Sequence, residues 1–215
     1  AQYLDRDEAL RRAKAIPDNY ARMGIIWSAH FQDALSAFGM EHALMVMLTN
    51  PEMFKAVIDR ITEFYLKANE IFYESTMGYL DAVLIGNDFG SQTGLMLEPA
   101  LIQDLVWPGT KQLIDQAKSY GLTVMHHSCG SIFPLIDDLK NLGVDVIHPI
   151  QALADEMDAP NLKKHFDKKI AFCGGVDAQY LLVNGTPDDV SKKVQELREL
   201  FPTGLIMSPS HEAIL

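Results

Sequence analysis

The segment Leu122-Thr-Val-Met-His-His-Ser-Cys-Gly130 carries the pattern that decides the fold: a short apolar run that ends in polar residues and a glycine. A run of this length between turn signals is typical of a buried strand. Similar runs recur along the chain, and the strands they predict are 23–27, 82–86, 122–126, 145–148, 169–173 and 204–208. Between them, apolar residues recur at helical spacing. Short strands that alternate with helices indicate parallel βα units.

The helical segments are expected at 9–16, 31–48, 51–72, 98–120, 132–142, 161–166 and 187–201. The long one has a clear start in Asn50-Pro51-Glu52, since proline suits the first helical position and an acidic side chain suits the first turn. Pro108 predicts a kink within the segment 98–120.

Polar side chains follow nearly every predicted strand, and they separate two folds that share this alternation. They are Asp88, Gln92, His127, Cys129, His148, Gln151, Asp177, Gln179 and His211. In a (β/α)8 barrel all strand carboxyl ends open onto one face, whereas a doubly wound sheet collects its functional groups at one switch point. The pattern therefore predicts a TIM barrel.

The predicted strands supply about six of the eight βα units of such a barrel, which typically spans about 250 residues. We therefore expect residues 1–215 to form a single barrel domain, the C-terminal two-thirds of a longer chain, with the N-terminal units missing.

The composition excludes several classes of protein. With 48% hydrophobic residues and 22% charged residues, the 215-residue chain is neither a disordered tail nor a fibre. Its net charge of −11 argues against nucleic-acid binding. No apolar run approaches the roughly 18–20 residues of a membrane span. Cys129 and Cys173 lie in separate motifs, which favours a reduced, cytoplasmic compartment.

A candidate metal site follows the strand at 122–126. His127 and Cys129 offer imidazole and thiolate, which zinc prefers, from one turn that Gly130 allows to be tight. His211 follows the last predicted strand and should face the same mouth, so we expect it as the third ligand. If the strand ended one residue differently, His126 would point inward instead.

The other strand-end residues are candidates for substrate binding: Gln92, His148, Gln151, Gly174 and Asp177. Gly174-Gly175 allows close approach of a ligand, or equally a tight βα turn. Asp88 is a candidate catalytic residue or an outer-shell partner of the metal. The simpler alternative is that it only forms part of a polar turn before the next helix. Cys173 lies within its strand and is expected as a small buried residue.

The motifs together resemble the uroporphyrinogen decarboxylase superfamily. The resemblance is carried by His127-Ser-Cys-Gly-Ser, Gly143-Val-Asp-Val-Ile-His-Pro-Ile-Gln151 and Phe172-Cys-Gly-Gly-Val-Asp177, with Gly86-Asn-Asp-Phe-Gly-Ser-Gln92 upstream. It runs from about Met23 to the end of the chain. It implies a (β/α)8 barrel with its site in the mouth at the strand carboxyl ends.

That superfamily includes the haem-pathway decarboxylase and corrinoid-dependent methyltransferases, which use zinc to activate a thiol. The sequence His127-x-Cys129 resembles the zinc motif of the methyltransferases. Their third ligand is a cysteine after the last strand, where this chain has His211, so the pattern is mixed. The resemblance therefore implies zinc and a corrinoid, which is either a substrate or carried by a partner protein.

Our leading hypothesis is transfer of a methyl group between a corrinoid and a thiol. The alternative is decarboxylation of a uroporphyrinogen-type tetrapyrrole without a metal, with Asp88 holding the pyrrole NH groups and His211 donating a proton. A third alternative is a barrel that binds a tetrapyrrole or a corrinoid protein without chemistry. A porphyrinogen with many carboxylates needs arginine or lysine in the mouth, and the visible strand ends carry neither.

Overall fold

The structure is a computed structural model that describes residues 4–76 and 78–210. Its six strands follow one another in the sheet in chain order, and the paired neighbours β1–β2, β4–β5 and β5–β6 run parallel. A doubly wound sheet would reverse its strand order, so the predicted barrel-type α/β fold is confirmed. The strands are β1 (Met23–Ile25), β2 (Ala82–Gly86), β3 (Thr123–His127), β4 (Val146–Ile150), β5 (Ala171–Val176) and β6 (Leu205–Pro209).

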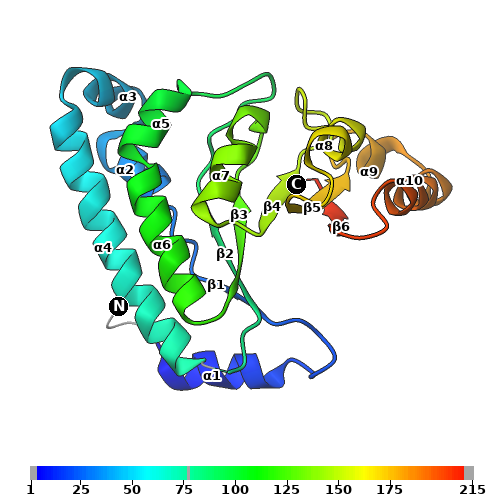
Figure 1. Ribbon diagram of the computed structural model, residues 1–215, viewed down its shortest axis with the longest axis horizontal. Helices are drawn as coiled ribbons and strands as arrows, with labels where there is room; N and C mark the ends of the chain where they lie inside the picture. The colour runs from blue at the N-terminus through cyan, green and yellow to red at the C-terminus, as the bar shows by residue number, and fades with distance from the viewer. Residues whose placement is uncertain (1–3, 77, 211–215) are drawn as a thin grey trace. The chain divides into compact units, whose positions relative to one another are not determined.

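Helices lie between successive strands, as the alternation predicts (Figure 1). They are α1 (Arg6–Ala15), α2 (His30–Phe38), α3 (Met40–Thr49), α4 (Pro51–Ser75), α5 (Pro99–Leu105), α6 (Trp107–Ser119), the short 3-10 helix η1 (Phe133–Leu135), α7 (Ile136–Leu142), α8 (Ala159–Phe166), α9 (Leu181–Asn184) and α10 (Pro187–Leu200).

The chain divides into two compact units. The first holds the described residues up to Asn87 together with Pro99–Met125, and the second holds Asp88–Glu98 and the described residues from His126 onward. The loop after β2 therefore belongs to the same unit as the carboxyl end of β3.

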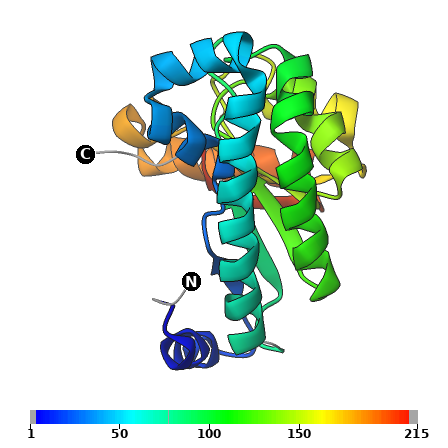
Figure 2. The same ribbon diagram turned by 90° about the vertical axis from the view of Figure 1, so that its left-hand side faces the viewer.

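In the first unit, α4 and α6 lie side by side, and α1 lies near the carboxyl end of α4 (Figure 2). The start of α4 is the predicted one, because the Asn50 side chain accepts a hydrogen bond from the Met53 N–H and Pro51 takes the first helical position. The expected helix at 31–48 is wrong as a single helix. Gly39, with φ +78°, ends α2 and begins α3, since only glycine adopts this backbone conformation readily.

The apolar core of the second unit contains a row of aromatic rings. Phe166 contacts Phe172 edge-on, and Phe172 contacts Phe201 in the same way, with centroid distances of 6.4 and 6.0 Å. Thr186 caps α10, because its side chain accepts a hydrogen bond from the Asp189 N–H. In turn, the Thr186 N–H donates to the Asp189 carboxylate. This packing and capping hold β5 and β6 against α8 and α10, which gives the loop after β5 a firm base.

The first unit also buries a histidine that predicts a pH-dependent stability. His30 is 1% exposed, and its ring nitrogens lie 3.3 Å from the Ser28 and Val106 carbonyl oxygens. Burial lowers the pKa of His30 below its ordinary value near 6.5. The unfolded chain therefore takes up this proton at higher pH than the folded chain does.

As a result, we expect the free energy of unfolding to fall as the pH decreases below about 6.5, by up to about 1.4 kcal/mol per pH unit from this one group. Urea unfolding of wild type and His30→Asn between about pH 5 and pH 7.5 measures the difference in slope. His42→Asn, at an exposed histidine of α3, is the matched control variant. An unchanged slope in His30→Asn would contradict the assignment.

Candidate functional site

Four loops of the second unit carry the candidate site, and each follows the carboxyl end of a strand. They follow β2, β3, β4 and β5, as the sequence pattern predicts. The contacting side chains come from these loops or from β3 and β4 themselves, and they are Asp88, Gln92, His127, Ser128, Cys129, His148, Gln151, Asp177 and Gln179. His211 lies outside the described residues, so its place among the ligands stays a prediction.

Three potential metal donors converge at the centre of these loops. The His127 Nε2 atom lies 3.4 Å from the Cys129 Sγ atom and 3.3 Å from the Asp88 Oδ1 atom. One ligand atom from each residue lies within 4.8 Å of the other two. The His127 side chain is 11% exposed and that of Asp88 is 32% exposed, so the cluster is partly buried.

These separations can be compared with those of a zinc site. With Zn–S bonds of about 2.3 Å and Zn–N and Zn–O bonds of about 2.0–2.1 Å, tetrahedral geometry places sulfur about 3.5 Å from nitrogen and nitrogen about 3.3 Å from oxygen. Both contacts of His127 agree with these values. An imidazole, a thiolate and a carboxylate are ordinary zinc ligands, so the donor set fits this metal. Three protein ligands also leave a fourth position for a substrate.

Two glycines bring the loop of Asp88 against the turn of Cys129. A Cβ atom on Gly90 would lie 2.8 Å from the Cys129 carbonyl oxygen, and one on Gly130 would lie 2.4 Å from the Gly90 carbonyl carbon. Gly130 also has φ +84°, a conformation that favours glycine. The two segments are thus in direct backbone contact.

Hydrogen bonds also join the loop of Asp88 to the turn of Cys129. The Cys129 N–H donates to Asp88 Oδ1 at 2.8 Å, and the Phe89 N–H donates to the Ser128 hydroxyl at 3.0 Å. The Ser131 N–H donates to the Ser91 carbonyl oxygen at 2.8 Å. Sequence reasoning gave Ser128 no role, although its place inside the His-x-Cys motif was a signal.

The structure distinguishes His127 from its neighbour His126. Successive side chains of a strand point to opposite faces. His126 is buried against Phe89, with the two rings stacked at 6.1 Å and 10°. His127 lies on the other side, with the donors. His127 is therefore the histidine of the candidate metal site.

A second histidine, His148, contacts the ring of the candidate ligand His127. His148 Nδ1 lies 2.8 Å from His127 Nδ1, and the ring centroids are 4.9 Å apart. Burial, together with the neighbouring His127, lowers the pKa of His148 to about 4, so this ring is neutral at pH 7. His148 was expected to bind substrate. In the structure its side chain is hydrogen-bonded to His127, the histidine of the candidate metal site.

Three glutamines form a chain that also supports the Cys129 turn. The Gly130 N–H donates to Gln151 Oε1 at 2.8 Å, and Gln151 Nε2 donates to Gln92 Oε1 at 2.9 Å. Gln92 in turn donates to the Leu153 carbonyl oxygen at 2.6 Å and lies 3.5 Å from Gln179 Oε1. Gln92 and Gln151, predicted to bind substrate, thus hold each other and the loop. Gln179 was not assigned a role, although it also follows a strand.

Gly174 and Asp177 have local structural partners. A Cβ atom on Gly174 would lie 2.5 Å from the Ile150 nitrogen, so this glycine, with φ +122°, allows β5 to approach β4. The Asp177 carboxylate accepts hydrogen bonds from the N–H groups of Gln179, Tyr180 and Leu181. These contacts fix the turn that leads into the short helix α9 (Leu181–Asn184). Substrate binding by either residue stays a prediction.

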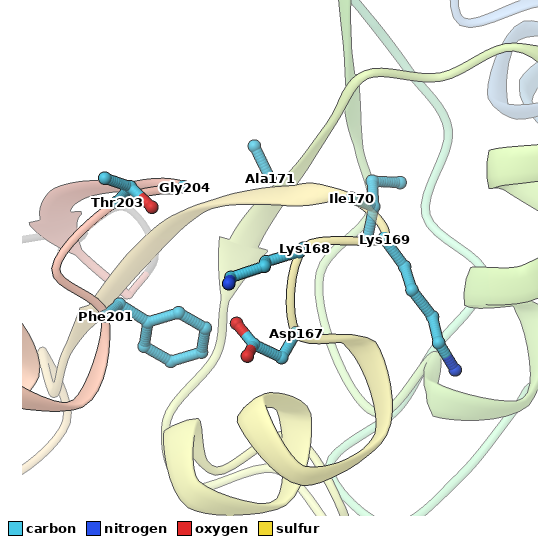
Figure 3. A pocket seen from close by; sticks show the side chains of 8 residues that line it. All are labelled: Asp167, Lys168, Lys169, Ile170, Ala171, Phe201, Thr203 and Gly204. Atoms are coloured by element: carbon cyan, nitrogen blue, oxygen red, sulfur yellow. The ribbon is translucent and has the colours of Figure 1, made fainter.

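A pocket of about 250 Å³ lies at the opposite end of β5 and β6 (Figure 3). It is lined by Asp167, Lys168, Lys169, Ile170, Ala171, Phe201, Thr203 and Gly204. Lys168 and Asp167 point toward the Phe201 ring, whereas Lys169 points away from it (Figure 3). These residues lie at the amino-terminal ends of the two strands, and the amino-terminal face of a barrel serves stability rather than chemistry. The donor cluster is therefore the better candidate site.

Comparison with known proteins agrees with this fold and these motifs. The sequence profile described as Uroporphyrinogen decarboxylase (URO-D) matches residues 8–215, so the chain belongs to this family, and the resemblance found in the sequence is confirmed. No curated protein sequence matches significantly.

A methyltransferase from Methanosarcina mazei has a similar solved structure, with a TM-score of 0.74 and 14% sequence identity. The match covers 95% of this chain and 57% of that protein, so this chain spans a little over half of its length. At this identity the likeness shows a shared fold. Among the described residues, no helix combines the length and apolarity that crossing a membrane requires.

Proposed function

We propose that this protein is a zinc-dependent methyltransferase that moves a methyl group between a methylated corrinoid and a thiol. The observation that carries the proposal is the cluster of Asp88, His127 and Cys129, in which both contacts of the His127 Nε2 atom have the spacing of tetrahedral zinc ligands. We propose Asp88 as the third described ligand, with His211 as a further candidate.

Zinc bound at these residues would lower the pKa of a substrate thiol, so that a thiolate is available at neutral pH. The thiolate sulfur forms a bond to the methyl carbon, and the bond between methyl and donor breaks with its electron pair left on the donor. The residues of the chain hold the acceptor in place. His127, Cys129 and Asp88 fix its position, and the junction of Gly90 with Gly130 keeps their loops together.

The charge of the strand-end loops supports this function over decarboxylation of a polycarboxylate. The segments 87–98, 127–132, 148–158 and 176–186 contain no lysine or arginine. Their acidic residues are Asp88, Glu98, Asp155, Glu156, Asp158 and Asp177. Carboxylate substrates are recognised best by the planar fork of arginine. These loops suit a neutral or cationic group better.

The second candidate is decarboxylation of a uroporphyrinogen-type tetrapyrrole. It is favoured by the family match over residues 8–215 and by the one-third exposure of the Asp88 carboxylate, which could accept pyrrole N–H donors. In that reaction Asp88 would stabilise positive charge as carbon dioxide leaves.

The test combines metal analysis with two assays on the full-length protein. We expect about one zinc per chain by mass spectrometry, and zinc-dependent loss of the methyl group from methylcobalamin in the presence of a simple thiol. The methylated thiol is measured as the second product. Decarboxylation of uroporphyrinogen without zinc would replace the proposal with the second candidate, and tight tetrapyrrole binding without turnover would indicate a binding protein.

A further inference from the structure

The pair His127–His148 is a feature of the second unit that the proposed function does not use. Both histidines come from neighbouring strands in chain order, β3 and β4, and their Nδ1 atoms lie 2.8 Å apart. At this distance one nitrogen carries a proton and the other accepts it. The direction of that hydrogen bond decides which nitrogen of His127 has its lone pair available.

We propose that His148 is a positioning residue: its Nδ1 accepts the Nδ1 proton of His127 and thereby keeps the Nε2 lone pair of His127 aimed between Cys129 and Asp88. This inference rests on the proposed function for the identity of the ion.

The direction of the bond follows from the chemistry of imidazole. A neutral ring has one N–H donor and one N acceptor, and a metal ligand uses the acceptor. The His127 Nε2 atom is the one that faces the other donors, 3.4 Å from Cys129 Sγ and 3.3 Å from Asp88 Oδ1. With a metal ion on Nε2, the ring proton therefore lies on Nδ1, which is 2.8 Å from the Nδ1 atom of His148.

The backbone of β4 explains why His148 can take this place. The pairing of β4 with β5 shifts register between Ile147 and Ile150, at His148 and Pro149. Such irregularities redirect side chains and are frequent beside functional sites. The His148 carbonyl oxygen also accepts from the Ser128 N–H at 2.8 Å, which fastens this part of β4 to the residue after His127. The two rings are thus held together by backbone as well as by side chains.

Two replacements separate the hydrogen bond from the shape of the side chain. His148→Asn places an amide oxygen near the position of Nδ1 and keeps an acceptor. His148→Leu has a similar shape without one. His165→Leu, at an exposed histidine of α8 in the same unit, is the matched control.

The first measurement is zinc affinity by competition with a chromophoric chelator. Loss of an outer hydrogen-bond partner of a ligating histidine typically weakens metal binding about 10- to 100-fold. We expect a loss of this size in His148→Leu, a several-fold smaller loss in His148→Asn and no change in His165→Leu. Equal zinc affinity of His148→Leu and wild type would overturn the proposal.

The second measurement observes the proton positions directly. In ¹⁵N-histidine-labelled full-length protein, ring nitrogen shifts show which atoms carry protons, and a coupling across the bond identifies the two partners. In the zinc-loaded protein we expect a proton on His127 Nδ1 and none on His148 Nδ1. Bound zinc with a proton on His148 Nδ1 would overturn the inference and leave the proposed function standing. If wild type binds no zinc, the proposed function fails, and the positioning role of His148 fails with it.

Discussion

Cys129→Ser is expected to abolish stoichiometric zinc binding while the protein stays folded. The thiolate is the softest of the three described donors, and a serine hydroxyl is not a zinc ligand of comparable strength. The loss should exceed the roughly 10- to 100-fold effect of an outer partner. Because Cys129 is partly exposed, the smaller oxygen atom should leave the packing of the loop unchanged. Zinc content and chelator competition measure the first effect, and circular dichroism with thermal unfolding measures the second.

The chain contains a matched control for this replacement. Cys173 is buried in β5, where its Sγ atom lies 3.5 Å from the Ser208 hydroxyl, and burial raises its pKa. A buried thiol with a raised pKa is a poor metal ligand. Cys173→Ser should therefore keep its zinc. Equal loss of zinc in both variants would mean that general destabilisation, rather than a missing ligand, explains the result.

The largest effect on stability is expected from Gly130→Ala. The new Cβ atom would lie 2.4 Å from the Gly90 carbonyl carbon and 2.5 Å from its oxygen, in a residue with φ +84°. Positive-φ strain and overpacking add, so the free energy of unfolding should fall by about 2–5 kcal/mol. Relief of the clash would separate the Cys129 turn from the loop of Asp88. We therefore also expect weaker zinc binding.

Gly204→Ala separates the effect of backbone strain from that of overpacking. Gly204 has nearly the same φ, +81°, but an added Cβ atom would have no neighbour within 4 Å. Only the backbone strain applies there, which predicts a loss of about 1–2 kcal/mol and unchanged zinc affinity. Chemical unfolding of both variants gives the comparison. If the two losses were equal, the contact of Gly130 with Gly90 would not be the tight one that the structure shows.

Much of the fold could be predicted because its signals are local. The six apolar runs became six strands, with ends that moved by a few residues, since β3 begins at Thr123 and β5 extends to Val176. Asn50 and Pro51 start α4, and the break at Val106 between α5 and α6 lies beside Pro108. Gly39 was missed as a helix end because the apolar spacing continues across it. In such a case only the backbone conformation of the glycine separates one helix from two.

In the candidate site, too, features that are local in the sequence could be predicted and contacts between distant residues could not. His127 and Cys129 could be recognised from the sequence, because residues two apart in one turn after a strand are held together by the chain itself. The contacts of Asp88 with His127 and Cys129, 39 and 41 residues away, could not. Nor could the pairing of His127 with His148, or the bond from Gly130 to Gln151, each 21 residues apart.

These distant contacts depend on how the loops after β2, β3 and β4 approach one another. That approach is set by the backbone contact of Gly90 with Gly130 and by the register shift of β4 at His148 and Pro149. Residue types at the strand ends therefore indicated where a candidate site lies. Which side chains gather as candidate metal donors, and which contact them from outside, was decided by tertiary structure, because hydrogen bonds and metal ligands act only over distances of about 2–3.5 Å.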